Sequence, residues 1–174
     1  MLHNTFCRRL AALVLTLAVA LSAALPGFAA YPMPVQTATE TESVYLFNAD
    51  TGKTILNQNA GQQQYVASLT KLMTALLLLE SGKDLNGEVT VPTALTQEFR
   101  DIQNANGTTI GLRIGETVRR IDLLNAMLIV SANDAASVIA WDVGGSVVGF
   151  VQQMNAKAAE LGCTGTNFTC AHGL

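Results

Sequence analysis

Runs of apolar residues separated by short polar breaks divide this chain into predicted helices and strands. One run begins just after Ser68 and continues through four consecutive leucines, Leu76 to Leu79, until Glu80 and a Ser-Gly pair follow. The leucine-rich composition and the glycine just past its end predict a helix over about 68–80. Because this helix is apolar nearly all round, we expect it to lie inside a domain.

The remaining pattern predicts a hairpin near the start of the domain and three more helices after it. Two short β-like runs, 43–48 and 54–57, are separated by an Asp- and Gly-containing turn, which is typical of a hairpin. A short extended piece at 87–91 precedes a stretch, 93–118, that we interpret as loop with brief strands. Apolar spacing then predicts helices over 121–130, 135–143 and 147–161.

A serine and a lysine stand three residues apart on the first predicted helix. Ser68 and Lys71 therefore share one face, one turn apart. A lysine on an apolar helix must either reach water or be desolvated, and desolvation lowers its pKa. A neutral lysine beside a hydroxyl is a base beside a nucleophile, and a helix N-terminus favours the anion that forms. The four-residue pattern alone is weak, because it arises by composition in roughly half of chains of this length.

A second polar group, Ser131-Ala132-Asn133, interrupts two apolar helical runs. One interpretation is structural, with Asn133 or Asp134 serving as the N-cap of the following helix. The other is functional, with Ser131 as a proton-relaying hydroxyl and Asn133 as an amide that both donates and accepts hydrogen bonds. The residues alone leave both open.

The first 29 residues are predicted to be a signal peptide. Arg8 and Arg9 precede an apolar stretch at 10–25, and Gly27 and Ala29 supply small residues at the cleavage positions. An uncleaved membrane anchor is the alternative. Residues 30–42 are then expected to be a flexible lead-in and 43–174 to be part of one domain.

Charge and cysteine usage narrow the function classes. After residue 29 the chain has 8 basic and 13 acidic residues, a balance of −5, with no basic cluster. This argues against nucleic acid and acidic lipid as partners. Cys163 and Cys170 could form a disulfide outside the cytoplasm, or remain two free buried thiols. His172 is the only histidine left, so a zinc site is disfavoured and no cofactor is predicted.

Taken together, Ser-x-x-Lys followed by Ser-x-Asn is the opening of the signature of penicillin-binding proteins and serine β-lactamases. The stretches 67–75, 131–136 and the terminal His-Gly-Leu at 172–174 resemble the serine D-Ala-D-Ala carboxypeptidases, the low-molecular-mass penicillin-binding proteins. The resemblance runs over 43–174. It implies the DD-peptidase/β-lactamase-like α/β (α+β) fold, an antiparallel sheet flanked by a helical region, with only the first hairpin and the helical cluster present here.

The resemblance also implies a reaction, its partners and a location. Ser68 would attack the carbonyl between the two D-alanines of a peptidoglycan stem peptide, with Lys71 accepting its proton and the Ser68 backbone N–H binding the oxyanion. Ser131 would relay a proton, and Asn133 would hold substrate and lysine. β-Lactams would acylate the same serine. The enzyme would act outside the cytoplasm of a bacterium, in the cell wall or periplasm, meeting the membrane only through the signal segment or a C-terminal anchor absent from this chain.

The chain departs from that family in one motif. No Lys-Thr-Gly triplet occurs, whereas the family carries it on a strand downstream of His-Gly. We therefore expect an N-terminal portion of a carboxypeptidase, from a truncated gene or an incomplete sequence. It would lack one wall of the site and one oxyanion donor, expose hydrophobic helix surface, and release little or no D-alanine.

Three other functions compete with this interpretation. A β-lactamase needs a deacylating carboxylate after Ser-x-Asn, and the only acids there are Asp134, Asp142 and Glu160, so we disfavour it. A non-catalytic wall-binding or sensor module on the same scaffold fits the missing motif but not the four intact polar residues. An independent module with chance motifs is the last alternative.

Overall fold

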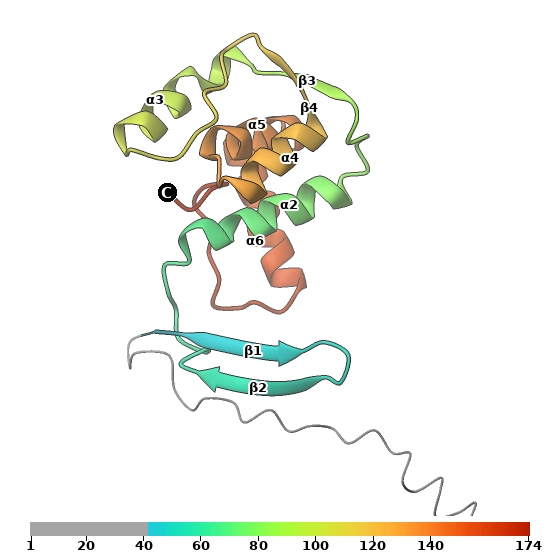
Figure 1. The fold of residues 1–174 in the computed structure, drawn as a ribbon, viewed down its shortest axis with the longest axis vertical. Coiled ribbons are helices and arrows are strands. Elements are labelled where there is room, and N and C mark those ends of the chain that lie inside the picture. The colour runs from blue at the N-terminus through green and yellow to red at the C-terminus, as the bar shows by residue number, and fades with distance from the viewer. Residues whose placement is uncertain (1–41) are drawn as a thin grey trace, which may run out of the picture. The chain divides into compact units, whose positions relative to one another are not determined.

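The computed structural model describes residues 42–174, which form two small antiparallel sheets and a cluster of helices (Figure 1). The predicted signal peptide and nearly all of the predicted lead-in lie outside the described residues. Within them no single helix is long and apolar enough to cross a membrane. Helices α5 (Asn133–Gly144) and α6 (Val147–Glu160) are together long and apolar enough, but they are bent by 82° at the break between them.

The predicted hairpin is confirmed. Strand β1 (Val44–Asn48) pairs antiparallel with β2 (Lys53–Gln58), with an irregularity in register between Leu46 and Phe47. The turn is closed by Asn48, whose Oδ1 accepts the Thr51 N–H at 2.9 Å. No residue of either strand is buried, so the hairpin adds nothing to the core of the described chain.

The stretch between the first and second predicted helices contains one helix that the pattern did not predict. Strand β3 (Glu88–Thr90) confirms the extended piece expected at 87–91. It pairs antiparallel with β4 (Thr117–Arg119), the strand that begins within the stretch 93–118. Between them, turn η2 (Thr93–Leu95) leads into helix α3 (Thr96–Asn104). Only Ile102 of α3 is buried, so its apolar periodicity is too sparse to be recognised.

The four predicted helices are all confirmed, to within two residues at each end. The 68–80 helix is preceded by a single 3-10 turn that carries Ser68, so its α-helical part begins two residues later than expected. The bounds are η1 (Ala67–Leu69), α2 (Thr70–Glu80), α4 (Arg120–Ile129), α5 (Asn133–Gly144) and α6 (Val147–Glu160).

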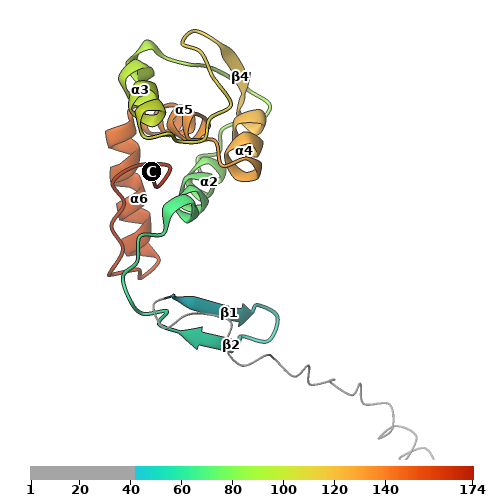
Figure 2. The same ribbon diagram turned by 60° about the vertical axis from the view of Figure 1, so that its left-hand side comes forward.

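Helix α5 is the centre of the core, and α2, α4 and α6 all pack against it (Figure 2). Its first eight residues, 133–140, are all buried. Gly144 lets α6 approach closely, because a Cβ there would lie 2.6 Å from the Phe150 backbone N. Burying each large core side chain contributes roughly 1.5–3 kcal/mol. The largest fully buried apolar ones are Leu78, Leu95, Ile102, Leu123, Met127, Ile139, Phe150 and Met154.

Helix α2 is buried on one face only, which corrects the expectation that it is enclosed. The buried face includes Thr70, Lys71 and Thr74, whereas Leu72 and Leu79 are 60% and 56% exposed. The physical reason is that the helices packing against α2 cover the face with Leu77 and Leu78 and leave Leu72 and Leu79 uncovered. The expected exposed hydrophobic surface is therefore present.

Candidate active site

Ser68 and Lys71 meet at the start of helix α2. Ser68 lies on the 3-10 turn η1 and Lys71 on the first turn of α2, and Lys71 Nζ is 3.2 Å from Ser68 Oγ. The chain enters this turn through Ala67, whose φ of +46° is uncommon for a residue with a Cβ. The spacing of three residues therefore brings the two groups together, as the sequence predicts.

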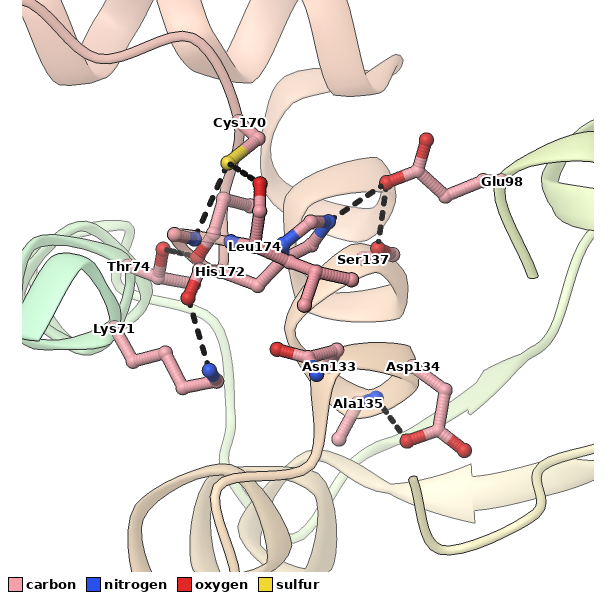
Figure 3. Close-up of polar contacts among 12 residues, drawn as sticks. Lys71, Thr74, Glu98, Asn133, Asp134, Ala135, Ser137, Cys170, His172 and Leu174 are labelled. Atoms are coloured by element: carbon pink, nitrogen blue, oxygen red, sulfur yellow. Dashed lines mark hydrogen bonds and ion pairs between the residues drawn. The ribbon is translucent and has the colours of Figure 1, made fainter. Parts of the chain in front are cut away.

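Lys71 is almost completely buried, with 2% of its surface exposed. Its Nζ also donates a hydrogen bond to the His172 carbonyl at 2.9 Å (Figure 3). Burial lowers the pKa of Lys71, and the negative charge of the Cys170 thiolate opposes that shift only in part. Both hydrogen-bond acceptors of Nζ are neutral groups, so the site favours the unprotonated amine more than water does.

Ser131 completes a chain of three polar groups. It lies between α4 and α5, and its Oγ is 2.8 Å from Ser68 Oγ. Its backbone φ is +60°, a conformation that costs roughly 1–3 kcal/mol for a residue other than glycine. The Ser131 hydroxyl, the Ser68 hydroxyl and the Lys71 amine therefore form one continuous hydrogen-bonded path, with Ser68 in the middle. The left-handed backbone at Ala67 and Ser131 has no signal in the sequence.

Asn133 is the first residue of α5 and is 5% exposed. Its Nδ2 donates to the Thr108 carbonyl at 3.0 Å, and its backbone N–H donates to the same oxygen at 2.8 Å. These contacts tie the start of α5 to the loop before β4. No hydrogen bond joins Asn133 to Lys71 in the described chain, so the expected contact with the lysine is not seen.

Asp134 anchors the same loop. Its carboxylate accepts the backbone N–H of Ile110 at 3.2 Å and of Leu112 at 3.0 Å, as well as that of Ala135 at 2.9 Å. The N-cap of α5 is Ala132, which makes no side-chain capping bond. The prediction that Asn133 or Asp134 is the N-cap is therefore wrong. Asn133 bonds to the loop before β4, whereas Asp134 joins that loop to the Ala135 N–H in the first turn of α5.

The segment 170–174 lies against helix α2 next to Lys71 and Thr74 (Figure 3). Thr74 Oγ1 donates to the Ala171 carbonyl at 2.6 Å, which fixes this segment on α2. Gly173 has a φ of +79°, and a Cβ there would collide with the Ala67 carbonyl oxygen. Only glycine permits this close approach. The segment thereby places the His172 carbonyl against Lys71.

The His172 ring contacts Glu98 of α3, and Ser137 of α5 holds that carboxylate in place. Its Nε2 lies 3.2 Å from Glu98 Oε1, and Ser137 Oγ donates to the same carboxylate oxygen at 3.0 Å. A hydrogen bond from His172 lowers the pKa of Glu98 in spite of its burial. Sequence reasoning missed Glu98, because α3 itself was not predicted and the residues in contact are 74 positions apart.

Both cysteines of the described chain are free thiols, Cys163 exposed and Cys170 half-buried. The disulfide considered for them is not formed, and the free-thiol alternative holds except that neither thiol is fully buried. Cys170 Sγ instead accepts the Gly173 N–H at 3.1 Å. Among residues 42–174 no group of three His, Cys, Asp or Glu side chains is placed to hold a metal ion.

Comparison with known proteins shows which family this chain resembles. The family of D-alanyl-D-alanine carboxypeptidases matches residues 31–174. The chain is 34% identical over 142 residues to the D-alanyl-D-alanine carboxypeptidase DacF of Bacillus subtilis, covering 80% of this chain and 35% of that protein. It is 33% identical over 162 residues to a D-alanyl-D-alanine endopeptidase of Pseudomonas aeruginosa, covering 93% of this chain and 50% of the relative.

Solved structures give the same answer for the fold. The Streptomyces K15 DD-transpeptidase matches with a TM-score of 0.69 and 29% identity, over 80% of this chain and 55% of that one. Penicillin binding protein 5 of Haemophilus influenzae matches with a TM-score of 0.60 and 33% identity, over 71% and 36%. The chain thus spans a third to a half of the length of these two curated relatives. It belongs to the D-alanyl-D-alanine carboxypeptidase family, as the motifs around Ser68 and Ser131 predict.

Proposed function

We propose that this chain carries the nucleophile side of a serine-type D-Ala-D-Ala carboxypeptidase that removes the terminal D-alanine of peptidoglycan stem peptides. The observation that carries the proposal is the path Ser131–Ser68–Lys71, in which a buried lysine with lowered pKa lies 3.2 Å from a serine hydroxyl. That is the arrangement of an activated nucleophile. The names of the relatives support the substrate class.

The residues divide the acyl transfer between them. Ser68 Oγ attacks the carbonyl carbon of the D-Ala-D-Ala bond while its proton passes to Lys71 Nζ. The tetrahedral oxyanion is stabilised by the Ser68 backbone N–H, which belongs to the N-terminal turn and has no intrahelical partner. Ser131 Oγ relays the proton held by Lys71 to the departing amine of D-alanine as the C–N bond breaks, so that Lys71 returns to the neutral amine and Ser131 keeps its hydroxyl. Water then hydrolyses the ester on Ser68 and regenerates the hydroxyl.

Asn133 is assigned to substrate binding in this scheme. Its amide nitrogen is engaged with Thr108, and its side-chain oxygen is left to accept a substrate N–H. β-Lactams are the covalent inhibitors, because they present an acylating carbonyl to the same serine. The stem peptide is a small extracellular ligand, which is consistent with the absence of a basic cluster in the sequence.

The setting of the enzyme is part of the proposal. We assign 1–29 as a signal peptide, 30–42 as a lead-in, and 43–174 as the N-terminal part of the DD-peptidase domain. The protein then acts outside the bacterial cytoplasm, in cell-wall biogenesis and cell shape. Since the printed sequence has no Lys-Thr-Gly triplet, these 174 residues alone are expected to turn over substrate barely or not at all.

A second candidate is a non-catalytic wall-binding or sensor module on the same scaffold. The Ser68→Ala variant separates the two. With an enzyme site, fluorescent penicillin labels the folded wild-type chain covalently and the variant not at all. Both still bind a peptide ending in D-Ala-D-Ala, with an L-Ala-L-Ala peptide as control. Peptide binding without covalent label on the folded wild-type chain would favour the binding module and contradict the enzyme.

A further inference from the structure

The carbonyl that faces Lys71 belongs to the peptide group between His172 and Gly173, and both ends of that group are hydrogen-bonded. The His172 oxygen accepts from Lys71 Nζ at 2.9 Å, and the Gly173 N–H donates to Cys170 Sγ at 3.1 Å. Glycine restricts the rotation of an adjoining peptide group less than any other residue does. The contacts that hold His172 therefore help to set the direction of this carbonyl.

The His172 ring is hydrogen-bonded at both nitrogens, and the two bonds define its tautomer. Nδ1 accepts the Leu174 N–H at 3.1 Å, so Nδ1 carries no hydrogen. Nε2 then carries the hydrogen and donates it to Glu98 Oε1 at 3.2 Å. Because only 7% of the His172 side chain is exposed, water has little access to replace the carboxylate. Glu98 thus fixes the ring from another element, helix α3.

Glu98 is held in turn by the core helix α5. Ser137 of that helix is fully buried, and its Oγ donates to Glu98 Oε1 at 3.0 Å (Figure 3). Ser137 and His172 therefore donate to the same carboxylate oxygen. A carboxylate fixed by a buried hydroxyl of the core helix supports the ring rigidly, whereas a solvated surface carboxylate would not.

These bonds form one connected series from the core helix to the nucleophile. The series runs through Ser137, Glu98, the ring and carbonyl of His172, Lys71 and Ser68. Ring and carbonyl belong to one residue, so a ring that leaves Glu98 allows the carbonyl to move as well. Lys71 Nζ then loses a hydrogen-bond acceptor, and its distance to Ser68 Oγ, already 3.2 Å, is free to lengthen.

We propose that Glu98 is a positioning residue for the acyl transfer, because through the His172 ring it fixes the carbonyl that orients Lys71. The proposal rests on the proposed function, in which Lys71 accepts the proton of Ser68. Glu98 acts through His172 and not on the reacting atoms. A misplacement of about 1 Å can cost on the order of 100-fold in rate. Since Thr74 still holds the neighbouring carbonyl, we expect a smaller loss, about tenfold, without Glu98.

The first test is the rate of acylation by fluorescent penicillin in the folded full chain, with the rate constant at saturation separated from the half-saturating concentration. Glu98→Ala should lower the rate constant about tenfold and leave the half-saturating concentration unchanged. Glu98→Gln should recover most of the rate, because its Oε1 can accept from both His172 and Ser137. Asp101→Ala is the matched control, since Asp101 is an exposed carboxylate on the same helix that accepts from Gln97.

A second measurement reports on Lys71 directly and does not require acylation. The chain has four lysines, so labelling lysine Cε with carbon-13 gives four resonances, and Lys71→Arg identifies the one that belongs to Lys71. Glu98→Ala should move this resonance and leave the other three in place, whereas Glu98→Gln should move it much less. A folded wild-type chain that is not acylated would count against the proposed function, and the Lys71 resonance would still decide whether Glu98 positions the lysine.

Two variants of His172 give the same information if Glu98→Ala does not fold. His172→Gln places an amide N–H near the position of Nε2, whereas His172→Asn keeps only an acceptor near the position of Nδ1. We expect His172→Gln to retain more of the acylation rate and a smaller shift of the Lys71 resonance than His172→Asn. A Glu98→Ala chain with the wild-type acylation rate and Lys71 resonance overturns the proposal. A Glu98→Gln chain that matches Glu98→Ala also overturns it, because Glu98 would then act through its charge.

Discussion

At the scale of single residues, the site depends on side chains that fix the segment 170–174 against helix α2. Thr74 is fully buried and donates to the Ala171 carbonyl at 2.6 Å, and Lys71 donates to the next carbonyl along the segment. The segment 170–174 forms no helix or strand, so these two carbonyl groups accept their hydrogen bonds from side chains instead. Loss of one such bond should therefore release the carbonyl that holds Lys71.

Thr74→Val keeps the shape of this side chain but leaves the buried Ala171 carbonyl without a donor. We expect the free energy of unfolding to fall by about 2 kcal/mol, and penicillin acylation to slow. Thr74→Ser keeps the hydroxyl and loses one methyl group, about 0.8 kcal/mol, with acylation retained. Urea unfolding and labelling rates check both variants. A Thr74→Val chain as stable as the wild type contradicts this account.

Glu98 should couple stability to acid pH. Its hydrogen bond with His172 holds the pKa of Glu98 below its unfolded value of 4.5, so its stabilisation is present above pH 4.5 and is lost as pH falls through the folded pKa. We expect Glu98→Gln to cost about 1 kcal/mol at pH 7. The gap between the two chains should narrow in denaturant titrations as the pH falls below 4.5 and through the lowered pKa of Glu98. A gap that persists undiminished at pH 3 would argue that Glu98 acts by packing.

The sequence predicts contacts between residues that are neighbours along one helix, and fails for contacts that depend on the tertiary fold. The spacing of Ser68 and Lys71 requires only helical geometry to place them together. The pairing of His172 with Glu98 requires α3 to pack near α5, which no local pattern encodes. The left-handed backbone of Ala67 and Ser131 is likewise imposed by the fold, since neither residue type favours it.

At the scale of elements, the terminal segment fits between η1 and α5 only because Gly173 has no side chain. Gly173→Ala adds a Cβ that collides with the Ala67 carbonyl oxygen at a φ of +79°. We expect a loss of roughly 1–3 kcal/mol in stability and of most penicillin acylation, because the turn carrying Ser68 must move. Unfolding and labelling experiments measure the two effects.

Gly165→Ala is the matched control. A Cβ at this position would meet only Gln63 Nε2, at an ordinary 3.8 Å. Its effect on stability should stay within about 0.5 kcal/mol and its acylation should equal that of the wild type. Equal effects of the two alanines would show that the close approach of Gly173 to Ala67 does not matter for the site.

Elements with strong apolar periodicity were predictable, and those without it were not. Helix α6, with apolar residues such as Val151, Met154 and Ala158 at helical spacing, is found as predicted. Helix α3 is mostly polar and only Ile102 of it is buried, so the sequence pattern predicts a loop there. The hairpin was recognisable from its turn residues alone, although neither strand has a buried face.

At the scale of the whole molecule, the described chain leaves large apolar side chains uncovered next to the site. Leu69, Leu72 and Leu79 on η1 and α2 are more than half exposed, as is Ile129 at the end of α4. Surface of this kind favours association. The family resemblance of the sequence predicts this exposed apolar surface, because in that family the helices are expected to pack on a sheet.

We predict that the isolated chain self-associates with rising concentration and binds hydrophobic dyes. Leu72→Gln/Ile129→Gln should reduce both effects while changing the free energy of unfolding by less than about 1 kcal/mol, because both side chains are exposed. Sedimentation and dye fluorescence provide the measurements. A wild-type chain that stays monomeric and binds no dye would contradict the prediction.

Intact-mass spectrometry after exposure to benzylpenicillin shows whether Ser68 is a nucleophile already activated within these 174 residues. We predict one penicilloyl adduct per chain, formed slowly, mapping to Ser68 and absent from the Ser68→Ala variant. The free thiols of Cys163 and Cys170 stay unmodified. A folded chain that forms no adduct, or forms one at another residue, would show that the path Ser131–Ser68–Lys71 does not make an active nucleophile.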